Sequence, residues 1–253
     1  MPARRAPSPV RIVSLAPGAT ATLSALGAAE AVVGVTNHCP LDRERLGGWL
    51  DPDRDRVVAL DPDLVVTGDA LQAEVRDGLR DRGCEVHHRN PTTLRGVVES
   101  METLGAAVGR ADAGRELRRD CERRLARVRE RVPDGDRPTV YCEEWPDPPM
   151  VAGNWVPAAV EAAGADYPFR DPGERSGEAD PAAVAAADPD HVVLHYCGYG
   201  ERADPEAVRD RDGWDLGDAT VHVLHDDLLN QPSPELVAGV ERLAALVHGV
   251  DVG

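Results

Sequence analysis

Apolar positions recur at helical spacing through the middle of the chain, between Thr92 and Pro133. The first half of this segment has them at Leu94, Val97, Val98, Met101, Leu104 and Val108. The second half has them at Leu117, Cys121, Leu125, Val128 and Val132. Steps of three and four place such side chains on one face of a helix. The pattern predicts two helices in tandem, the second being about 33 Å long if it runs from Ala111 to Val132.

The hydrophobic pattern on either side of these helices is repeated. Asp61-Pro62-Asp63 precedes the apolar run Leu64–Val66, and Asp188-Pro189-Asp190 precedes His191–Val193. Each copy is typical of a turn that leads into a buried strand. A helix ending at a glycine comes before each copy, and another strand, at 85–87 or 221–224, follows it.

This repetition predicts two similar α/β lobes joined by the central helices. The domains are expected at residues 9–91 for the N-terminal lobe, 92–136 for the helical segment and 137–251 for the C-terminal lobe. Within the first lobe, Gly47–Arg56 is polar and is expected to be a loop. Glu143–Trp155 is expected to be a proline-stiffened loop of the second lobe.

Candidate binding residues follow the predicted strands. Parallel α/β sheets bind ligands at the carboxyl ends of their strands, and Pro17, His38, His195 and Tyr196 all come after such ends. The loop Glu143–Trp155 adds two tryptophans, whose flat apolar faces suit a large planar ligand. Both tryptophans are also compatible with simple packing of the loop onto its own lobe.

The sequence contains no recognisable catalytic or structural metal motif. His38 and Cys39 could ligate a metal, but neighbouring residues on a short loop seldom point at one ion. Glu143 and Glu144 alternate along a strand, which argues against an acid–base pair. The five cysteines lie far apart without a CxxC pair, so neither a zinc ribbon nor a disulfide framework is indicated. We therefore expect binding rather than catalysis.

The charge balance is strongly acidic, with 45 acidic and 28 basic residues and a net charge of −17. The chain has no lysine, and many of its arginines lie on the second central helix. Nucleic acid is an unfavourable partner for such a protein because phosphates would be repelled. We interpret the surface as one that stays soluble in high salt, and the arginine face as a solvated face with ion pairs.

No stretch approaches 18 consecutive apolar residues, so no membrane span is predicted. The first residues, MPARRAPSPV, are not followed by an apolar signal-peptide region. The sequence as written is thus expected to be cytoplasmic. An upstream leader would instead make the protein extracytoplasmic and membrane-associated.

Several long segments resemble one family of binding proteins. They are RIVSLAPGATATLSALGAAEAVVGVTNHCP, VVALDPDLVVTG, the central helix, EEWPDPPMVAGNWVPAAVEAAGA and NQPSPELVAGVERLAALVHG. Together they resemble the cobalamin-binding branch of the helical-backbone (class III) substrate-binding proteins of ABC importers. The resemblance implies two Rossmann-like α/β lobes bridged by one long α-helix. It also implies a corrinoid ligand in the cleft between the lobes.

The resemblance further implies roles for individual residues. Corrin contacts would come from Pro17, Trp145, Trp155 and His195, and we add His38, Asn154 and Tyr196 as ligand-binding candidates. Glu74 and Glu201 resemble the carboxylates with which the family docks onto its permease. They lie 13 residues after Asp61 and Asp188, respectively.

The chain also departs from the family pattern. Gly18 stands where the family usually has the serine of PSAT, and Asn154 stands where histidine is common. A protein ligand to cobalt would then have to be His195 or His38. We expect a monomer without a cofactor of its own, holding a corrinoid as ligand. The alternatives are a cytoplasmic carrier of corrinoid, haem or iron chelate, and a metal or tetrapyrrole lyase using His38, Cys39 or His195.

Overall fold

The computed structural model describes residues 10–135 and 137–250. The arginine-containing start of the sequence lies outside the described residues, as do the predicted domain borders at Pro9, Asp136 and Asp251. The three-part domain division therefore stays a prediction.

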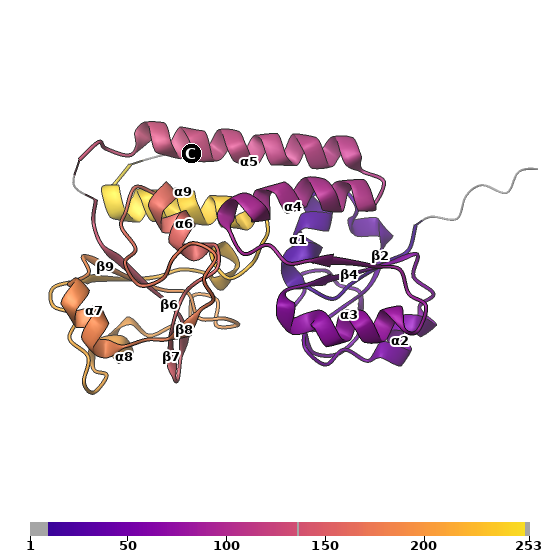
Figure 1. Cartoon of the computed structure of the whole chain (residues 1–253), viewed down its shortest axis with the longest axis horizontal. Helices are drawn as coiled ribbons and strands as arrows, with labels where there is room; N and C mark the ends of the chain where they lie inside the picture. Colours follow the sequence, from indigo (N-terminus) through magenta and orange to yellow (C-terminus); the bar gives the residue numbers. More distant parts are fainter. Residues whose placement is uncertain (1–9, 136, 251–253) are drawn as a thin grey trace, which may run out of the picture. The chain divides into compact units, whose positions relative to one another are not determined.

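The chain divides into two compact units, each of which contains a sheet and its helices (Figure 1). Unit 1 consists of the chain up to Asn90 together with Met101–Leu117. Unit 2 consists of Pro91–Ser100 together with the chain from Arg118 onward. The predicted fold class, two Rossmann-like α/β lobes, is confirmed.

Unit 1 is built on a five-stranded parallel sheet in the order β3-β2-β1-β4-β5. Its strands are β1 (Ile12–Ser14), β2 (Val32–Val35), β3 (Glu44–Arg45), β4 (Leu64–Gly68) and β5 (Val86–Arg89). Neighbouring residues of a strand face opposite sides, so Ile12 and Val13 lie in two different buried clusters. Both faces of the sheet are therefore apolar and need covering helices.

Different helices cover the two faces of this sheet. The helices of this part of the chain are η1 (Ala29–Ala31), α1 (Pro17–Ala25), α2 (Arg54–Ala59), η2 (Ala70–Gln72) and α3 (Ala73–Arg80). Leu23 of α1 packs in the cluster with Ile12, and Leu79 of α3 packs in the cluster with Val13. The loop prediction for Gly47–Arg56 is wrong at its end, because α2 begins at Arg54. The Asp53 carboxylate accepts the N–H groups of Asp55 and Arg56 and caps the start of this helix.

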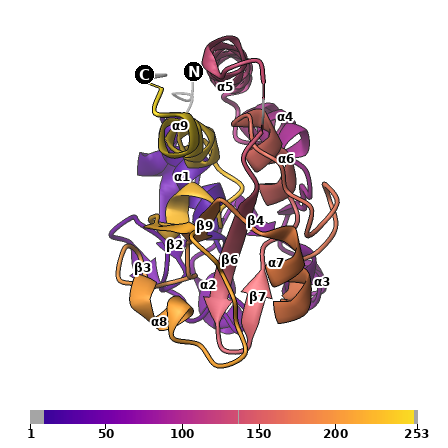
Figure 2. The same cartoon turned by 90° about the vertical axis from the view of Figure 1, so that its left-hand side faces the viewer.

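Unit 2 has a five-stranded sheet in the order β10-β9-β6-β7-β8. Its strands β9, β6 and β7 are labelled in Figure 2. Its strands are β6 (Val140–Pro146), β7 (Pro149–Val151), β8 (Gly177–Glu178), β9 (His191–Leu194) and β10 (Thr220–Val223). β6, β9 and β10 are parallel, whereas β7 and β8 pair antiparallel. The predicted loop at Glu143–Trp155 is thus largely a β-hairpin, since Pro146 and Pro149 pair directly across its turn.

The helices of unit 2 lie between and after its strands, and two of them start at aspartate caps. They are α6 (Val156–Ala162), α7 (Pro181–Ala187), α8 (Pro205–Arg209), η3 (Asp226–Leu228) and α9 (Glu235–His248). The carboxylates of Asp180 and Asp204 accept backbone N–H groups at the starts of α7 and α8, each with proline at the first position. These caps fix where each connection ends and the next helix begins.

The two Asp-Pro-Asp turns have the same hydrogen bonds. Asp63 accepts the N–H of Arg11 on its carboxylate at 2.7 Å and donates its own N–H to the Arg11 carbonyl at 2.9 Å. Asp190 makes the same two bonds with Thr139, also at 2.7 and 2.9 Å. In each unit, this turn therefore links the first strand to the strand beside it, which explains the repeat in the sequence.

Two helices, α4 (Leu94–Ala107) and α5 (Ala111–Arg131), occupy the middle of the chain, as predicted. Each contributes residues to both units. Gly109, with φ of 71°, makes the turn between them. Arg124 of α5 donates two hydrogen bonds to the Glu241 carboxylate of α9, at 2.6 and 2.8 Å, and so anchors α5 to α9. In the part of the chain that the structure describes, no helix is long and apolar enough to span a membrane.

Candidate functional site

Trp145 and Tyr199 form an exposed aromatic pair in unit 2. Trp145 lies near the end of β6 and is 41% exposed, and Tyr199 lies in the turn after β9 and is 39% exposed. Their rings meet edge to face at 6.2 Å. The Trp145 indole N–H is already bonded to the Asp147 carbonyl at 2.9 Å. The pair therefore offers apolar ring surface to solvent.

A buried ion pair lies beneath the aromatic pair. The Glu143 carboxylate on β6 is fully buried and accepts two bonds from the Arg211 guanidinium, at 2.7 and 2.8 Å. It also accepts the hydroxyl groups of Tyr141 at 2.7 Å and Tyr196 at 2.6 Å. Arg211 in turn lies 4.6 Å from the centre of the Trp214 ring. The carboxylate thus has four donors, as a buried charge requires.

The pKa directions agree with this geometry. Hydrogen bonding to the Glu143 carboxylate raises the pKa of Arg211, so its guanidinium stays charged. Burial, and then the bond to Glu143, raises the pKa of Tyr196, so its hydroxyl stays protonated and donates. Tyr196 was predicted to bind ligand directly, but the structure places it in the interior with its hydroxyl on Glu143.

The turn that carries Tyr199 is held by Asp226 on η3. One carboxylate oxygen of Asp226 accepts the N–H of Gly198 at 2.8 Å, and the other accepts that of Gly200 at 3.0 Å. Both glycines have positive φ, at 79° and 59°, a conformation in which glycine is favoured. The position of Tyr199 is thus fixed from its two sides by backbone bonds.

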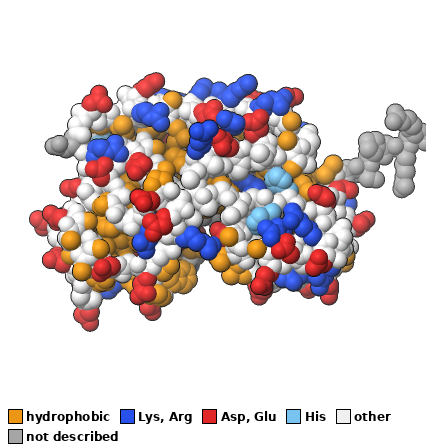
Figure 3. Space-filling model, in the orientation of Figure 1, with side chains coloured by type: hydrophobic (Ala, Val, Ile, Leu, Met, Phe, Trp, Pro, Cys, Tyr) orange, Lys and Arg blue, Asp and Glu red, His pale blue; other side chains and the backbone are white. Residues whose placement is uncertain are grey.

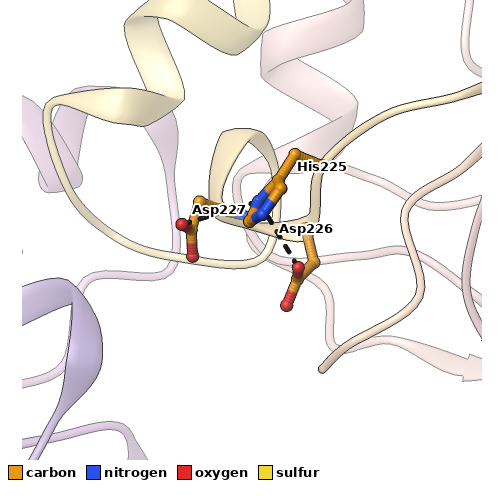
Figure 4. Close-up of side chains that lie close together, drawn as sticks. All are labelled: His225, Asp226 and Asp227. Atoms are coloured by element: carbon orange, nitrogen blue, oxygen red, sulfur yellow. Dashed lines mark hydrogen bonds and ion pairs between the residues drawn. The ribbon is translucent and has the colours of Figure 1, made fainter. Parts of the chain in front are cut away.

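His225, Asp226 and Asp227 offer three possible metal-ligand atoms within 4.8 Å of one another (Figure 4). The Nδ1 atom of His225 lies 3.5 Å from a carboxylate oxygen of each aspartate. It also accepts the Asp227 N–H at 3.2 Å, which caps η3. Burial raises the pKa of Asp227. Because Asp226 is bonded to the Tyr199 turn, we interpret the cluster as the anchor of that turn.

Trp155 and Asn154 follow strand β7, where Trp155 is buried and Asn154 is partly buried. Trp155 is only 7% exposed, and its indole N–H donates to the Leu229 carbonyl at 2.7 Å. Asn154 has φ of 54° and accepts the Gly173 N–H at 2.8 Å on its carbonyl. Asparagine adopts this left-handed conformation more readily than most residues. Both residues therefore contribute to the packing of unit 2.

His195 is fully buried at the end of β9. Its Nδ1 atom pairs with the side-chain oxygen of Asn230, whose amide nitrogen donates to the His195 carbonyl at 2.9 Å. Its Nε2 atom has no hydrogen-bond partner. Burial lowers the pKa of His195 to about 4, so the ring is neutral at neutral pH.

Two predicted binding residues lie in unit 1. Pro17 is half-buried at the first position of α1, after β1. His38 is exposed in the turn after β2. The neighbouring Cys39 is buried, and its Sγ atom lies 3.1 and 3.2 Å from the hydroxyls of Thr20 and Thr36. The structure thus separates the two side chains that the sequence offered as a metal pair, one exposed and the other buried among hydroxyls.

The predicted docking carboxylates occupy exposed positions, one in each unit. Glu74 lies in the first turn of α3 and Glu201 lies in the turn before α8. Gln72 holds the corner next to Glu74, because its side-chain amide bonds the Leu15 carbonyl at 2.9 Å and the Trp49 carbonyl at 2.6 Å. Glu74 is therefore presented on a well-anchored corner.

Comparison with known proteins settles the family. Residues 12–221 match the periplasmic binding protein family. The chain belongs to this family. A cobalamin-binding protein of Halobacterium salinarum is 29% identical to it over 263 residues, which cover 96% of this chain and 71% of that relative.

Solved structures of the family share the fold. The periplasmic heme-binding protein HutB of Vibrio cholerae has a TM-score of 0.82 at 16% identity and covers 95% of this chain and 100% of its own. The periplasmic vitamin B12 binding protein BtuF of the same species has a TM-score of 0.75 at 20% identity, with coverage of 94% and 96%. The expected resemblance to class III substrate-binding proteins is confirmed.

Sequence reasoning placed Tyr199 in a strand-end segment but did not select it as a binding residue, and it gave Arg211 no role in the site. The glycines on both sides of Tyr199 were a usable signal, because they mark a tight turn that would present the ring. No local signal connects Arg211 to Glu143, since 68 residues separate them. The prediction that Glu143 and Glu144 are not an acid–base pair agrees with the buried ion pair of Glu143.

Proposed function

We propose that this protein is a substrate-binding protein of an ABC importer and that it binds cobalamin or a related corrinoid. The family contains binding proteins, and one relative is named for cobalamin. The same fold serves heme in HutB and vitamin B12 in BtuF. Haem or another iron chelate is therefore the alternative ligand. The protein binds its ligand and does not transform it.

The observation that carries this proposal is the exposed aromatic pair of Trp145 and Tyr199. The two rings, at 41% and 39% exposure, lie in contact with each other and so present joined apolar surface, which is the kind of surface that marks a binding site. A flat macrocycle would bury their exposed surface, and a well-packed aromatic contact contributes about 1 kcal/mol beyond the buried area.

His195 and His38 are the two residues predicted as possible ligands to the metal of the bound molecule. The Nε2 atom of His195 has no hydrogen-bond partner, but the residue is fully buried and would have to become exposed to reach a ligand, whereas His38 is exposed already. Of the two predicted candidates, His38 is therefore the one whose position permits coordination. A changed aquocobalamin spectrum that persists in His195→Gln and disappears in His38→Ala would support His38. No spectral change on binding would mean that neither histidine coordinates.

The test of function is an absorbance titration of the purified chain, in molar salt, with aquocobalamin, cyanocobalamin, cobinamide and haem. We expect saturable corrinoid binding that Trp145→Ala weakens at least about tenfold, as for a central aromatic contact. Val58→Ala, which shortens an exposed apolar residue on α2, is the matched control and should bind like wild type. Binding of haem alone would favour the alternative, and binding of neither would refute the proposal.

We further infer that the protein acts outside the cytoplasm as a monomer and docks onto a permease through Glu74 and Glu201. The family name and the periplasmic solved relatives support this location. The cytoplasmic carrier remains its competitor. Fractionation of the native cells decides between them, because recovery of the full-length protein in the cytoplasm alone would contradict our inference.

A further inference from the structure

The Glu143–Arg211 ion pair is more elaborate than the packing of unit 2 requires. Taking the Glu143 carboxylate fully out of water is costly, although the Arg211 side chain stays 19% exposed, and a pair of this kind often contributes no more to stability than apolar residues of similar size. Here the pair nevertheless has a bidentate geometry, two additional tyrosine donors and the Trp214 ring beside the guanidinium. What such a network supplies is a defined orientation of the groups bonded to it.

One arm of the network leads to the exposed aromatic pair. Tyr196 is 5% exposed and its hydroxyl is bonded to Glu143 at 2.6 Å. Its ring meets that of Tyr199 edge to face, with centres 5.7 Å apart, and Tyr199 meets Trp145 in the same manner at 6.2 Å. Three rings are therefore arranged in series between a fixed carboxylate and the surface.

The other arm leads away from the exposed pair. Tyr141 is fully buried, and its hydroxyl is bonded to the same carboxylate at 2.7 Å. Its ring contacts Phe169 at 5.3 Å and Trp214 at 5.9 Å between centres. The two tyrosines thus make equivalent bonds to Glu143 but have different ring neighbours.

The geometry points to Glu143 and Arg211 as positioning residues that, through the Tyr196 hydroxyl, hold Tyr199 and Trp145 in the orientation that binds the macrocycle. This inference rests on the proposed function. The Asp226 bonds fix the backbone of the Tyr199 turn, and the Tyr196 bond fixes the ring against which Tyr199 leans. The binding surface is then formed before the ligand arrives, which lowers the entropic cost of binding.

The test compares Tyr196→Phe with Tyr141→Phe. Each variant removes one hydroxyl bond to the same carboxylate and keeps the ring, and in each the Glu143 carboxylate retains three donors. The readouts are the melting temperature and the Kd of the corrinoid that binds wild type most tightly. A single lost hydrogen bond should lower the melting temperature by about 2–4 °C in both variants.

We expect Tyr196→Phe to raise Kd about tenfold, because the ring at position 196 is no longer fixed by Glu143 and no longer holds Tyr199 in place. We expect Tyr141→Phe to leave Kd within about twofold of wild type. Equal Kd values for the two variants, whether unchanged or raised together, would overturn the inference while the proposed function stands. Failure of wild type to bind any of the four tetrapyrroles would refute the proposed function instead, and this inference with it.

Discussion

The imidazole of His195 makes the stability of unit 2 sensitive to acid. Its pKa is about 4 in the folded protein because it is buried, whereas an exposed histidine has a pKa of about 6.5. The unfolded chain therefore binds a proton as the pH falls through 6.5, and the folded protein does not until the pH approaches 4. The stability from this group is complete above pH 6.5 and is lost on acidification.

We predict that the free energy of unfolding falls by about 2–3 kcal/mol between pH 7 and pH 4.5 through His195 alone. Urea unfolding of wild type and His195→Gln at both pH values measures this, since the variant lacks the titrating ring. Burial also lowers the pKa of His87, His191 and His222, so both proteins should lose stability and only their difference reports on His195. An equal loss in the two proteins would contradict the assignment.

At the scale of single residues, sequence reasoning located strand-end side chains but not their burial. His195 and Tyr196 do follow β9 as predicted. Their environments depend on Asn230 and Glu143, which lie 35 and 53 residues away and have no pattern that marks them as partners. The tryptophans were distinguished only by the structure, since Trp145 is exposed while Trp155 is buried.

Among the elements, the contact of α9 with η3 depends on a glycine. A Cβ atom added at Gly239 would lie 2.2 Å from the Leu228 carbonyl oxygen and 3.0 Å from its carbon. Backbone atoms cannot move aside as the end of a side chain can. The helix can therefore approach η3 this closely only with glycine at position 239.

We predict that Gly239→Ala lowers the free energy of unfolding by about 1–3 kcal/mol, although alanine is the better helix former. Gly78→Ala in α3 is the matched control, because its added Cβ would meet only the guanidinium end of Arg54, which can move. The control should be neutral or stabilising by up to about 1 kcal/mol. Chemical denaturation measures the free energy of unfolding of both variants. Equal effects would show that the close contact at Leu228 does not determine the cost of the Gly239 substitution.

The elements themselves were largely predictable, because their signals are local. The Asp-Pro-Asp turns and the tandem helices were read directly from neighbouring residues. The antiparallel strands β7 and β8 were not, since the hairpin was interpreted as a loop on account of its prolines. β3 and β8 have only two residues each, too few to produce any periodic pattern.

At the scale of the whole molecule, the structure shows how charges of the two signs are distributed over the surface. On the face drawn in Figure 3, acidic side chains are scattered among basic and uncharged ones. The arginines of α5 are partly neutralised by neighbours, as in the Arg118–Glu122 and Arg123–Asp120 pairs. This agrees with the solvated, ion-paired face expected from the sequence. Interspersed charges of both signs favour solubility over association.

Glu74 and Glu201 are the exceptions that we propose, and they can be tested through uptake. Both carboxylates are exposed, one in each unit, and Glu201 lies two residues after Tyr199 in the same turn, whereas Glu74 lies in the other unit. We predict that Glu74→Arg leaves the corrinoid Kd unchanged, and that Glu74→Arg and Glu201→Arg both reduce uptake of labelled corrinoid, by cells that carry the protein and its importer, by more than any change in Kd explains. Reversal of one charge should weaken docking by at least about tenfold if the carboxylate pairs with a permease arginine.

Glu116→Arg is the control, because it reverses an exposed carboxylate on α5 and leaves the net charge of the variant the same as in the two test variants. If all three variants transport equally well, the two carboxylates have no special role. If all three fail equally, the loss follows from net charge rather than from docking. A double variant with both Glu74→Arg and Glu201→Arg is the last comparison. A greater loss of uptake in it than in either single variant would show that each unit provides one attachment point.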